Sequence, residues 1–209
     1  MELLAVCLAL LAGYLLGNLN GAVISSRLFM KEDVRAKGSG NAGITNFYRN
    51  YGKHGSLLVA LIDIGKTVAA AFLGLLVFRL LHVEGQGTLA KMLGGSGAVL
   101  GHMFPALLRF RGGKGVMSGA ALMLVMDWRM FLIALGIFAL VFFTTHYVSL
   151  ASIITAASYG PLFLVFYRGQ WPVVGLSVFI SWLAIFMHRA NLSRLRHGTE
   201  SKTYLNHKE

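Results

Sequence analysis

Seven apolar runs, separated by short polar loops, dominate the sequence and restrict what the chain can fold into. A helix needs about 20 apolar residues to cross about 30 Å of hydrocarbon, and most of the runs approach or exceed that length. We therefore expect an all-α integral membrane protein built as a bundle of seven transmembrane helices. The runs cover roughly residues 3–27, 55–81, 89–108, 115–126, 130–146, 148–167 and 171–187.

The composition supports a membrane location. Hydrophobic residues make up 56% of the 209 residues and charged residues only 13%, whereas a soluble domain carries about 25% charged residues. The formal net charge of +11 suits the anionic cytoplasmic face of a membrane, so we expect membrane lipids as partners. Nucleic acid is not expected, because basic nucleic-acid-binding proteins are not normally this apolar. The length suggests a single domain over residues 1–209.

The run at 115–126 is short, and loop charge is the test of whether it crosses. A run of this length is compatible with a short crossing, a re-entrant segment or a helix packed wholly inside the bundle. With seven crossings, 14 Lys and Arg residues share one side and 4 lie on the other; without this crossing the bias falls to 11 against 7. The positive-inside rule favours seven crossings, with the amino terminus outside and the tail in the cytoplasm. The larger set comprises Arg27, Lys31, Arg35, Lys37, Arg49, Lys53, Arg109, Arg111, Lys114, Arg189, Arg194, Arg196, Lys202 and Lys208, and the smaller set Arg79, Lys91, Arg129 and Arg168.

Several residues inside the apolar runs are polar or very small. Asp63 and Lys66 are three residues apart, so they share a helical face and can pair. Ionisable residues within a membrane are functional candidates by default, but a purely structural ion pair is an equal alternative. His102 ends the third run, where a lone histidine is more often structural than catalytic. We expect contacts between helices from Asn18, Asn20 and the Gly97–Gly101 pair.

Two glycine-rich loops look suited to hold phosphate. "GSGNAGITN" (38–46) and "FRGGKG" (110–115) combine flexible backbone, hydrogen-bond donors and cations; successive backbone N–H groups in such turns bind anions. Either loop alone could be a solvated connector. The seven-helix topology, however, gathers both loops, His102 and the start of the tail at the cytoplasmic side, which indicates a site for a phosphorylated substrate. The candidate residues are Gly38, Ser39, Gly40, Asn41, Thr45, Asn46 and Arg49 in the first loop, and Arg111, Gly112, Gly113 and Lys114 in the second.

Several kinds of chemistry are excluded by the residues present. No histidine lies five positions before any of the three aspartates, so the His-x4-Asp pair of the large acyl-CoA acyltransferases is absent. The eight acidic residues are scattered and the seven histidines lack zinc-binding spacing, so neither a metal nor another cofactor is expected. A site built from hydrogen-bond donors and cations remains, with histidine as its one obvious base.

Four motifs, in this order, resemble those of the bacterial membrane glycerol-3-phosphate acyltransferases that use acyl phosphate as the donor. They are "GSGNAGITNFYR", "LIDIGK", "GHMFPALLRFRGGKGV" and "HRANLSRLRHGTESK", and "VSLAS" at 148–152 is similar to a further family element. The resemblance covers the whole chain. It implies a seven-helix bundle of the bacterial cytoplasmic membrane with its site at the cytoplasmic face.

The resemblance also implies a reaction and its partners. A fatty acyl group passes from acyl phosphate to glycerol 3-phosphate, giving lysophosphatidic acid and phosphate in the first acylation of phospholipid synthesis. The soluble enzyme that produces acyl phosphate is a further implied partner. A transporter or channel for a phosphorylated solute is the alternative, but polar residues gather at one face and do not run through the membrane.

Residue roles follow by motif from the resemblance. Ser39, Arg49 and Lys114 are implied to grip phosphate, while either His188 or a substrate phosphate takes the proton from the glycerol hydroxyl. The implied catalytic residues are Ser39, Lys114, His188 and Asn191; the implied substrate-binding residues are Gly38, Gly40, Asn41, Thr45, Asn46, Arg49, His102, Arg111, Gly112, Gly113 and Glu200, with Asp63 and Lys66 in support.

Overall fold

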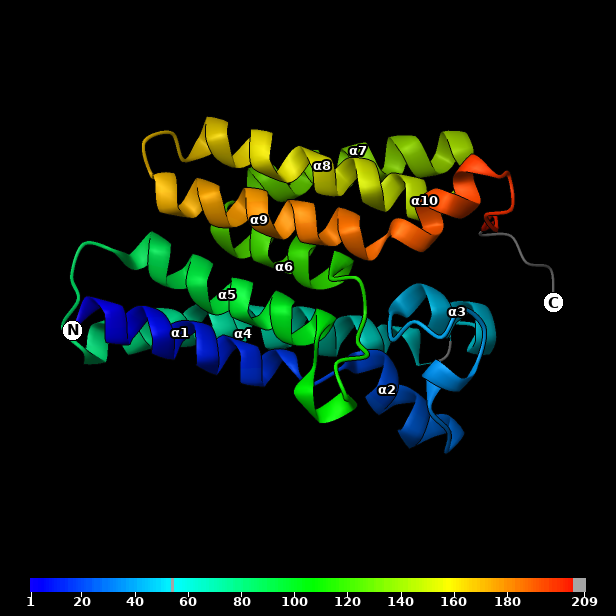
Figure 1. The fold of residues 1–209 in the computed structure, drawn as a ribbon, viewed down its shortest axis with the longest axis horizontal. Coiled ribbons are helices and arrows are strands. Elements are labelled where there is room, and N and C mark those ends of the chain that lie inside the picture. Colours follow the sequence, from blue (N-terminus) through cyan, green and yellow to red (C-terminus); the bar gives the residue numbers. More distant parts are fainter. Residues whose placement is uncertain (54, 205–209) are drawn as a thin grey trace. The chain divides into compact units, whose positions relative to one another are not determined.

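Every regular element is a helix in the parts of the chain that the computed structural model describes, residues 1–53 and 55–204 (Figure 1). Each of the seven predicted apolar runs contains a helix of its own. The main helices are α1 (Glu2–Gly17), α2 (Gly21–Ser25), α3 (Ile44–Tyr51), α4 (Ser56–Leu80), α5 (Gly87–Met103), α6 (Val116–Met126), α7 (Trp128–Thr145), α8 (Val148–Phe166), α9 (Trp171–Met187) and α10 (Arg189–Arg196). The short elements are the π-helix η1 (Ser26–Met30) and the 3-10 helices η2 (Val34–Ala36) and η3 (Ala106–Leu108).

The described ranges hold four helical stretches that are long and apolar enough to cross a membrane, or five if α9 and α10 form one bent span. The four are Glu2–Met30, Ser56–Leu80, Trp128–Thr145 and Val148–Phe166. The predicted all-α fold is therefore confirmed, and several of its helices have the length and composition of membrane spans. Helix α6 has 11 residues, which at 1.5 Å per residue is only about 17 Å of helix, and it packs against α4 and α5.

Contacts divide the chain into two compact units, Met1–Trp128 and the part from Arg129 onward. In the first unit, α5 packs against both α1 and α4. A Cβ added at Gly13 would collide with the carbonyl oxygen of Gly94, and one added at Gly74 would collide with that of Ala90. Gly97 likewise has no room for a side chain against α1. The close packing predicted for the G-x-x-x-G pair of α5 is thus confirmed, and backbone meets backbone along these contacts.

Gly74→Ala is expected to destabilise the protein by about 1–3 kcal/mol, because an added methyl group in a closely packed interface forces the helices apart. Gly65→Ala is the matched control on the same helix, since nothing lies within 4 Å of a Cβ added there. Thermal unfolding of the detergent-solubilised protein measures both. Equal melting temperatures for the two variants would contradict the packing of α4 on α5.

The first apolar run is not one helix to residue 27 but breaks between α1 and α2. The side chain of Asn20 accepts a hydrogen bond from the N–H of Val23 at 3.0 Å, which caps α2, and donates to the carbonyl of Ala42 at 3.0 Å. The side-chain oxygen of Asn18 accepts from the N–H of Leu107 at 3.1 Å. Asn20 therefore holds the first glycine-rich loop, and Asn18 connects the end of α1 with η3; neither joins two of the long helices, as the sequence had led us to expect.

The second unit contains the greater part of α7 together with α8, α9 and α10 (Figure 1). Helices α8 and α9 pack on each other, and the hydroxyl of Ser181 donates across this contact to the carbonyl of Ala156 at 2.6 Å. The guanidinium of Arg129 lies over the ring of Phe166, 5.0 Å from its centre, which connects α7 with α8. Between α9 and α10 the chain bends by 53°.

Candidate functional site

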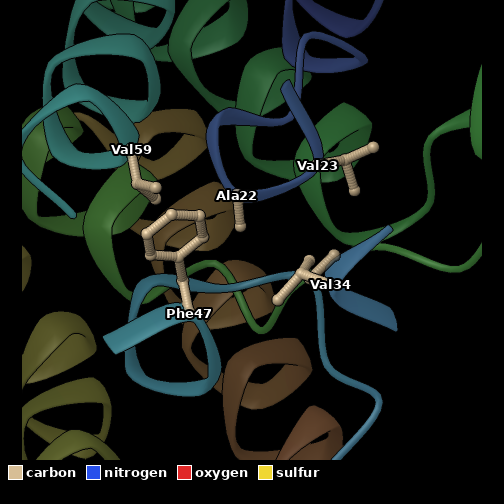
Figure 2. Packing of buried hydrophobic residues seen from close by; sticks show 6 residues of the cluster. Ala22, Val23, Val34, Phe47 and Val59 are labelled. Carbon is tan, nitrogen blue, oxygen red and sulfur yellow. The ribbon is translucent and has the colours of Figure 1, made fainter. Parts of the chain in front are cut away.

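The first glycine-rich loop is flanked by a small apolar core of its own (Figure 2). Ala22 and Val23 come from α2, Val34 from η2, Phe47 from α3 and Val59 from α4, and all five are buried. Figure 2 shows the ring of Phe47 pointing toward Val59 and Ala22. Because these elements precede and follow the loop, the core anchors the loop at both ends.

Asn46 fixes the path of this loop from its buried position in α3. Its side-chain oxygen accepts from the N–H of Ser39 at 2.9 Å, and its amide donates to the carbonyls of Val34 and Lys37 at 3.2 and 3.1 Å. Gly38 has φ +57°, and a Cβ there would lie 2.5 Å from the Asn46 oxygen. Asn46 thus shapes the loop, as predicted, through contacts with backbone.

The other predicted residues of the first loop are solvent-accessible to different degrees. Ser39 and Arg49 are exposed, whereas Asn41 and Thr45 are half-buried. Gly43 precedes α3 and offers no side-chain cap, so the positive end of this helix lies at the loop. The loop therefore offers hydrogen-bond donors at the start of α3, and Arg49 lies in the last turn of the same helix.

The second loop contains a strained turn followed by two tightly packed glycines. Arg109 and Phe110 have φ of 56° and 58°, a left-handed region that costs a residue with a side chain about 1–2 kcal/mol. The N–H of Gly113 donates to the carbonyl of His102 at 3.0 Å, and a side chain at Gly112 would collide with the same carbonyl. These glycines are needed for close approach to the end of α5.

The two loops meet at one end of the first unit. A Cβ added at Gly113 would lie 2.8 Å from the carbonyl oxygen of Ala42 in the first loop, the same oxygen that accepts from Asn20. Arg111 is exposed and Lys114 is half-buried just beside this contact in sequence. The structure thus brings together the two loops that the sequence singled out.

A buried ion pair lies beneath the loops. The ammonium of Lys66 donates to Asp63 at 2.8 Å and to the carbonyl of Leu19 at 2.7 Å, and lies 2.9 Å from Nδ1 of His102. Asp63 also accepts from the N–H of Gly21 at 3.2 Å. Nδ1 of His102 also lies 3.3 Å from Oδ1 of Asp63, so this ring nitrogen lies between the ammonium and the carboxylate. The predicted Asp63–Lys66 pair is confirmed, and His102 belongs to the same cluster.

In the second unit, His188 sits at the bend between α9 and α10 and is buried. Its Nδ1 lies 2.8 Å from the carbonyl oxygen of Ala184. Because a carbonyl only accepts, Nδ1 carries the proton, and Nε2 is the basic nitrogen of the neutral ring. This tautomer suits a histidine that receives a proton from a substrate.

Glu200 returns from the tail to hold Asn191 and Arg194. Its two carboxylate oxygens accept from the Asn191 amide and from Nε of Arg194, both at 2.7 Å. Burial would raise the pKa of Glu200, but hydrogen bonds from Asn191 and Arg194 contribute to a net pKa below the ordinary value. The carboxylate therefore stays charged and orients Asn191, a role that its motif alone did not define.

The fold and these residue groups define a multi-pass helical membrane protein with two glycine-rich, basic loops that meet in its first unit and a buried histidine, His188, in its second. Among the described residues, no group of three or more His, Cys, Asp or Glu is placed to hold a metal ion. The family profile described as "Glycerol-3-phosphate acyltransferase" matches residues 7–198.

Individual relatives agree over nearly the whole chain. A glycerol-3-phosphate acyltransferase of Prochlorococcus marinus (strain MIT 9312) is 38% identical, covering 93% of this chain and 96% of the relative. One from Clostridioides difficile (strain 630) is 35% identical, covering 97% of each. The glycerol 3-phosphate form of PlsY (YgiH), an integral membrane glycerol 3-phosphate acyltransferase, superposes with a TM-score of 0.82 at 30% identity, covering 95% of this chain and 96% of that one. Its lysophosphatidic acid form gives a TM-score of 0.80.

The chain belongs to the glycerol-3-phosphate acyltransferase family. The predicted family and the predicted class of enzyme are therefore confirmed.

Proposed function

We propose that this protein transfers a fatty acyl group from acyl phosphate to glycerol 3-phosphate, giving 1-acyl-glycerol 3-phosphate and inorganic phosphate. The observation that carries the proposal is the meeting of two glycine-rich, cationic loops at one end of the first unit. Acyl phosphate already contains a good leaving group. The enzyme therefore needs to position two anions, offset their repulsion and stabilise charge on the attacked carbonyl oxygen.

The proposed roles assign the first loop to glycerol 3-phosphate and the second to the donor. Ser39 and Arg49 hold the acceptor phosphate, because arginine can form two parallel hydrogen bonds with a phosphate. Lys114 holds the phosphate of the donor, and its charge offsets the repulsion between the two substrates. His188 takes the hydroxyl proton, and Asn191, which Glu200 holds, is the second proposed catalytic residue of the second unit.

The proposed topology has seven crossings, with the amino terminus outside and the loops and tail in the cytoplasm. The 14-to-4 distribution of Lys and Arg supports it, and each apolar run forms a helix. Helix α6 then crosses as a short segment packed on α4 and α5. A cytoplasmic site faces soluble glycerol 3-phosphate and the soluble enzyme that supplies acyl phosphate.

Purified full-length protein is expected to turn over with acyl phosphate and not with acyl-CoA of the same chain length. Recognition of coenzyme A normally needs a concave pocket that buries most of that large headgroup, and the second loop is a tight turn in which Arg111 is exposed and Lys114 is half-buried. Release of lysophosphatidic acid from labelled glycerol 3-phosphate measures the reaction. Comparable turnover with acyl-CoA, in the absence of acyl phosphate, would contradict the donor assignment.

A further inference from the structure

Arg35, just before the first loop, connects that loop with the second one. Its guanidinium forms a fork on Asp33, with Nε donating to Oδ1 at 2.9 Å and Nη2 to Oδ2 at 2.7 Å. Its remaining Nη1 donates to the carbonyl of Leu108 at 2.9 Å and, more weakly, to that of Arg111 at 3.4 Å. We call this set of contacts the Arg35 clamp.

The clamp encloses the strained turn of the second loop. The two carbonyls that it binds belong to the residues immediately before and after Arg109 and Phe110, the two consecutive left-handed residues. A backbone in such a conformation persists only where its surroundings hold it. The side chain of Arg35 is 21% exposed and that of its partner Asp33 is 26% exposed, so the contact is only partly screened by water.

Asp33 in turn keeps the guanidinium oriented. Its carboxylate accepts from the Arg35 backbone N–H at 3.0 Å as well as from the side chain. The hydrogen bond with Arg35 is the largest cause that lowers the pKa of Asp33 far below its ordinary value. Because Asp33 binds Nε and Nη2 of the planar guanidinium, the orientation of the remaining nitrogen, Nη1, is fixed, and Nη1 points toward the second loop.

We propose that Arg35 is a positioning residue that holds the 108–111 turn in its strained form and so sets where the second loop presents Arg111 and Lys114 to the donor phosphate. This inference rests on the proposed function for the identity of the donor. In this role Arg35 does not contact the substrate. Loss of the clamp therefore weakens donor binding while the chemical step, carried by other residues, proceeds.

Arg35→Gln is expected to raise the KM for acyl phosphate by about tenfold or more, as for the loss of a hydrogen bond to a charged group, with kcat within about threefold. Arg27→Gln is the matched control, because Arg27 donates to the same carboxylate, that of Asp33, at 3.0 Å, but its side chain is 58% exposed. Arg35→Lys keeps the charge without the fork, so its KM should lie between those of Arg35→Gln and the unaltered protein.

Hydrogen exchange of the amides in residues 106–113 gives a readout that does not depend on activity. It should be faster in Arg35→Gln and unchanged in Arg27→Gln, with helix α4 unaffected in both. Identical KM and exchange in the Arg35 and Arg27 variants would overturn the inference, as would a loss of kcat alone. Failure of the unaltered protein to use acyl phosphate would instead contradict the proposed function, and the exchange result would still decide the role of Arg35.

Discussion

His188→Ala is expected to lower kcat by about 10²–10⁴-fold, the range contributed by a positioned general base. The Nδ1 proton of His188 is committed to the carbonyl of Ala184, so Nε2 is the nitrogen able to receive the glycerol proton. The unaltered enzyme should lose activity as the pH falls through the histidine range, and the variant should lose that dependence. Initial rates between about pH 5 and 9, measured with both substrates saturating, test this.

His197→Ala is the matched control for His188→Ala. Nδ1 of His197 makes the same kind of contact, with the carbonyl of Ser193 four residues earlier at 2.8 Å, but the ring is exposed. Its activity should stay near that of the unaltered protein. A slow His188→Ala enzyme that keeps its pH profile would assign the proton to a substrate phosphate, and an unchanged rate would remove His188 from the site.

Lys66→Met is expected to destabilise the protein by about 3–5 kcal/mol, the effect of leaving one partner of a buried ion pair behind. The side chains of Lys66 and Asp63 are only 2% and 1% exposed. Removing the ammonium leaves the Asp63 carboxylate buried without its ion-pair partner. It also removes the contacts of Lys66 with the carbonyl of Leu19 and with Nδ1 of His102. Thermal unfolding in detergent should show the loss directly.

The double variant Asp63→Leu/Lys66→Met shows whether the lost stability comes from the broken ion pair or from general disruption of α4. Replacing both partners by apolar residues removes the stranded charge, so the double variant should be more stable than Lys66→Met alone. If the effects of the two substitutions simply add, the pair is not coupled and the structural role given to it is wrong.

Hydrophobicity and charge were enough to predict the class of fold, but not where helices break. Every apolar run became a helix because lipid-facing backbone favours that form. In the first run, however, helix α1 ends at Gly17, and the side-chain amides of Asn18 and Asn20 form hydrogen bonds with backbone outside that helix. Apolarity alone carries no sign of this, since Asn20 acts through Ala42, 22 residues away in sequence.

The motifs of the candidate site could be predicted from the sequence, whereas the residues that hold these motifs in place could not. The glycine-rich loops and the Asp63–Lys66 pair were visible from spacing. Arg35 was counted only as a cytoplasmic charge, because nothing local shows that it reaches the carbonyl of Leu108, 73 residues further along the chain. Glu200 was expected to bind substrate, but both its oxygens serve Asn191 and Arg194.

The glycine contacts of α5 have a mechanical consequence for the loops. Where carbonyl oxygens rest directly on glycine, no side chain can change rotamer to absorb a shift. Sliding α5 along α1 or α4 by one residue, about 1.5 Å, would drive a Cβ into a carbonyl group, so the axial register is locked. The end of α1 at Asn18 and the turn after α5 consequently stay at one level, and substrates must be accommodated by movement of loops and side chains, with the three helix axes serving as a stationary frame.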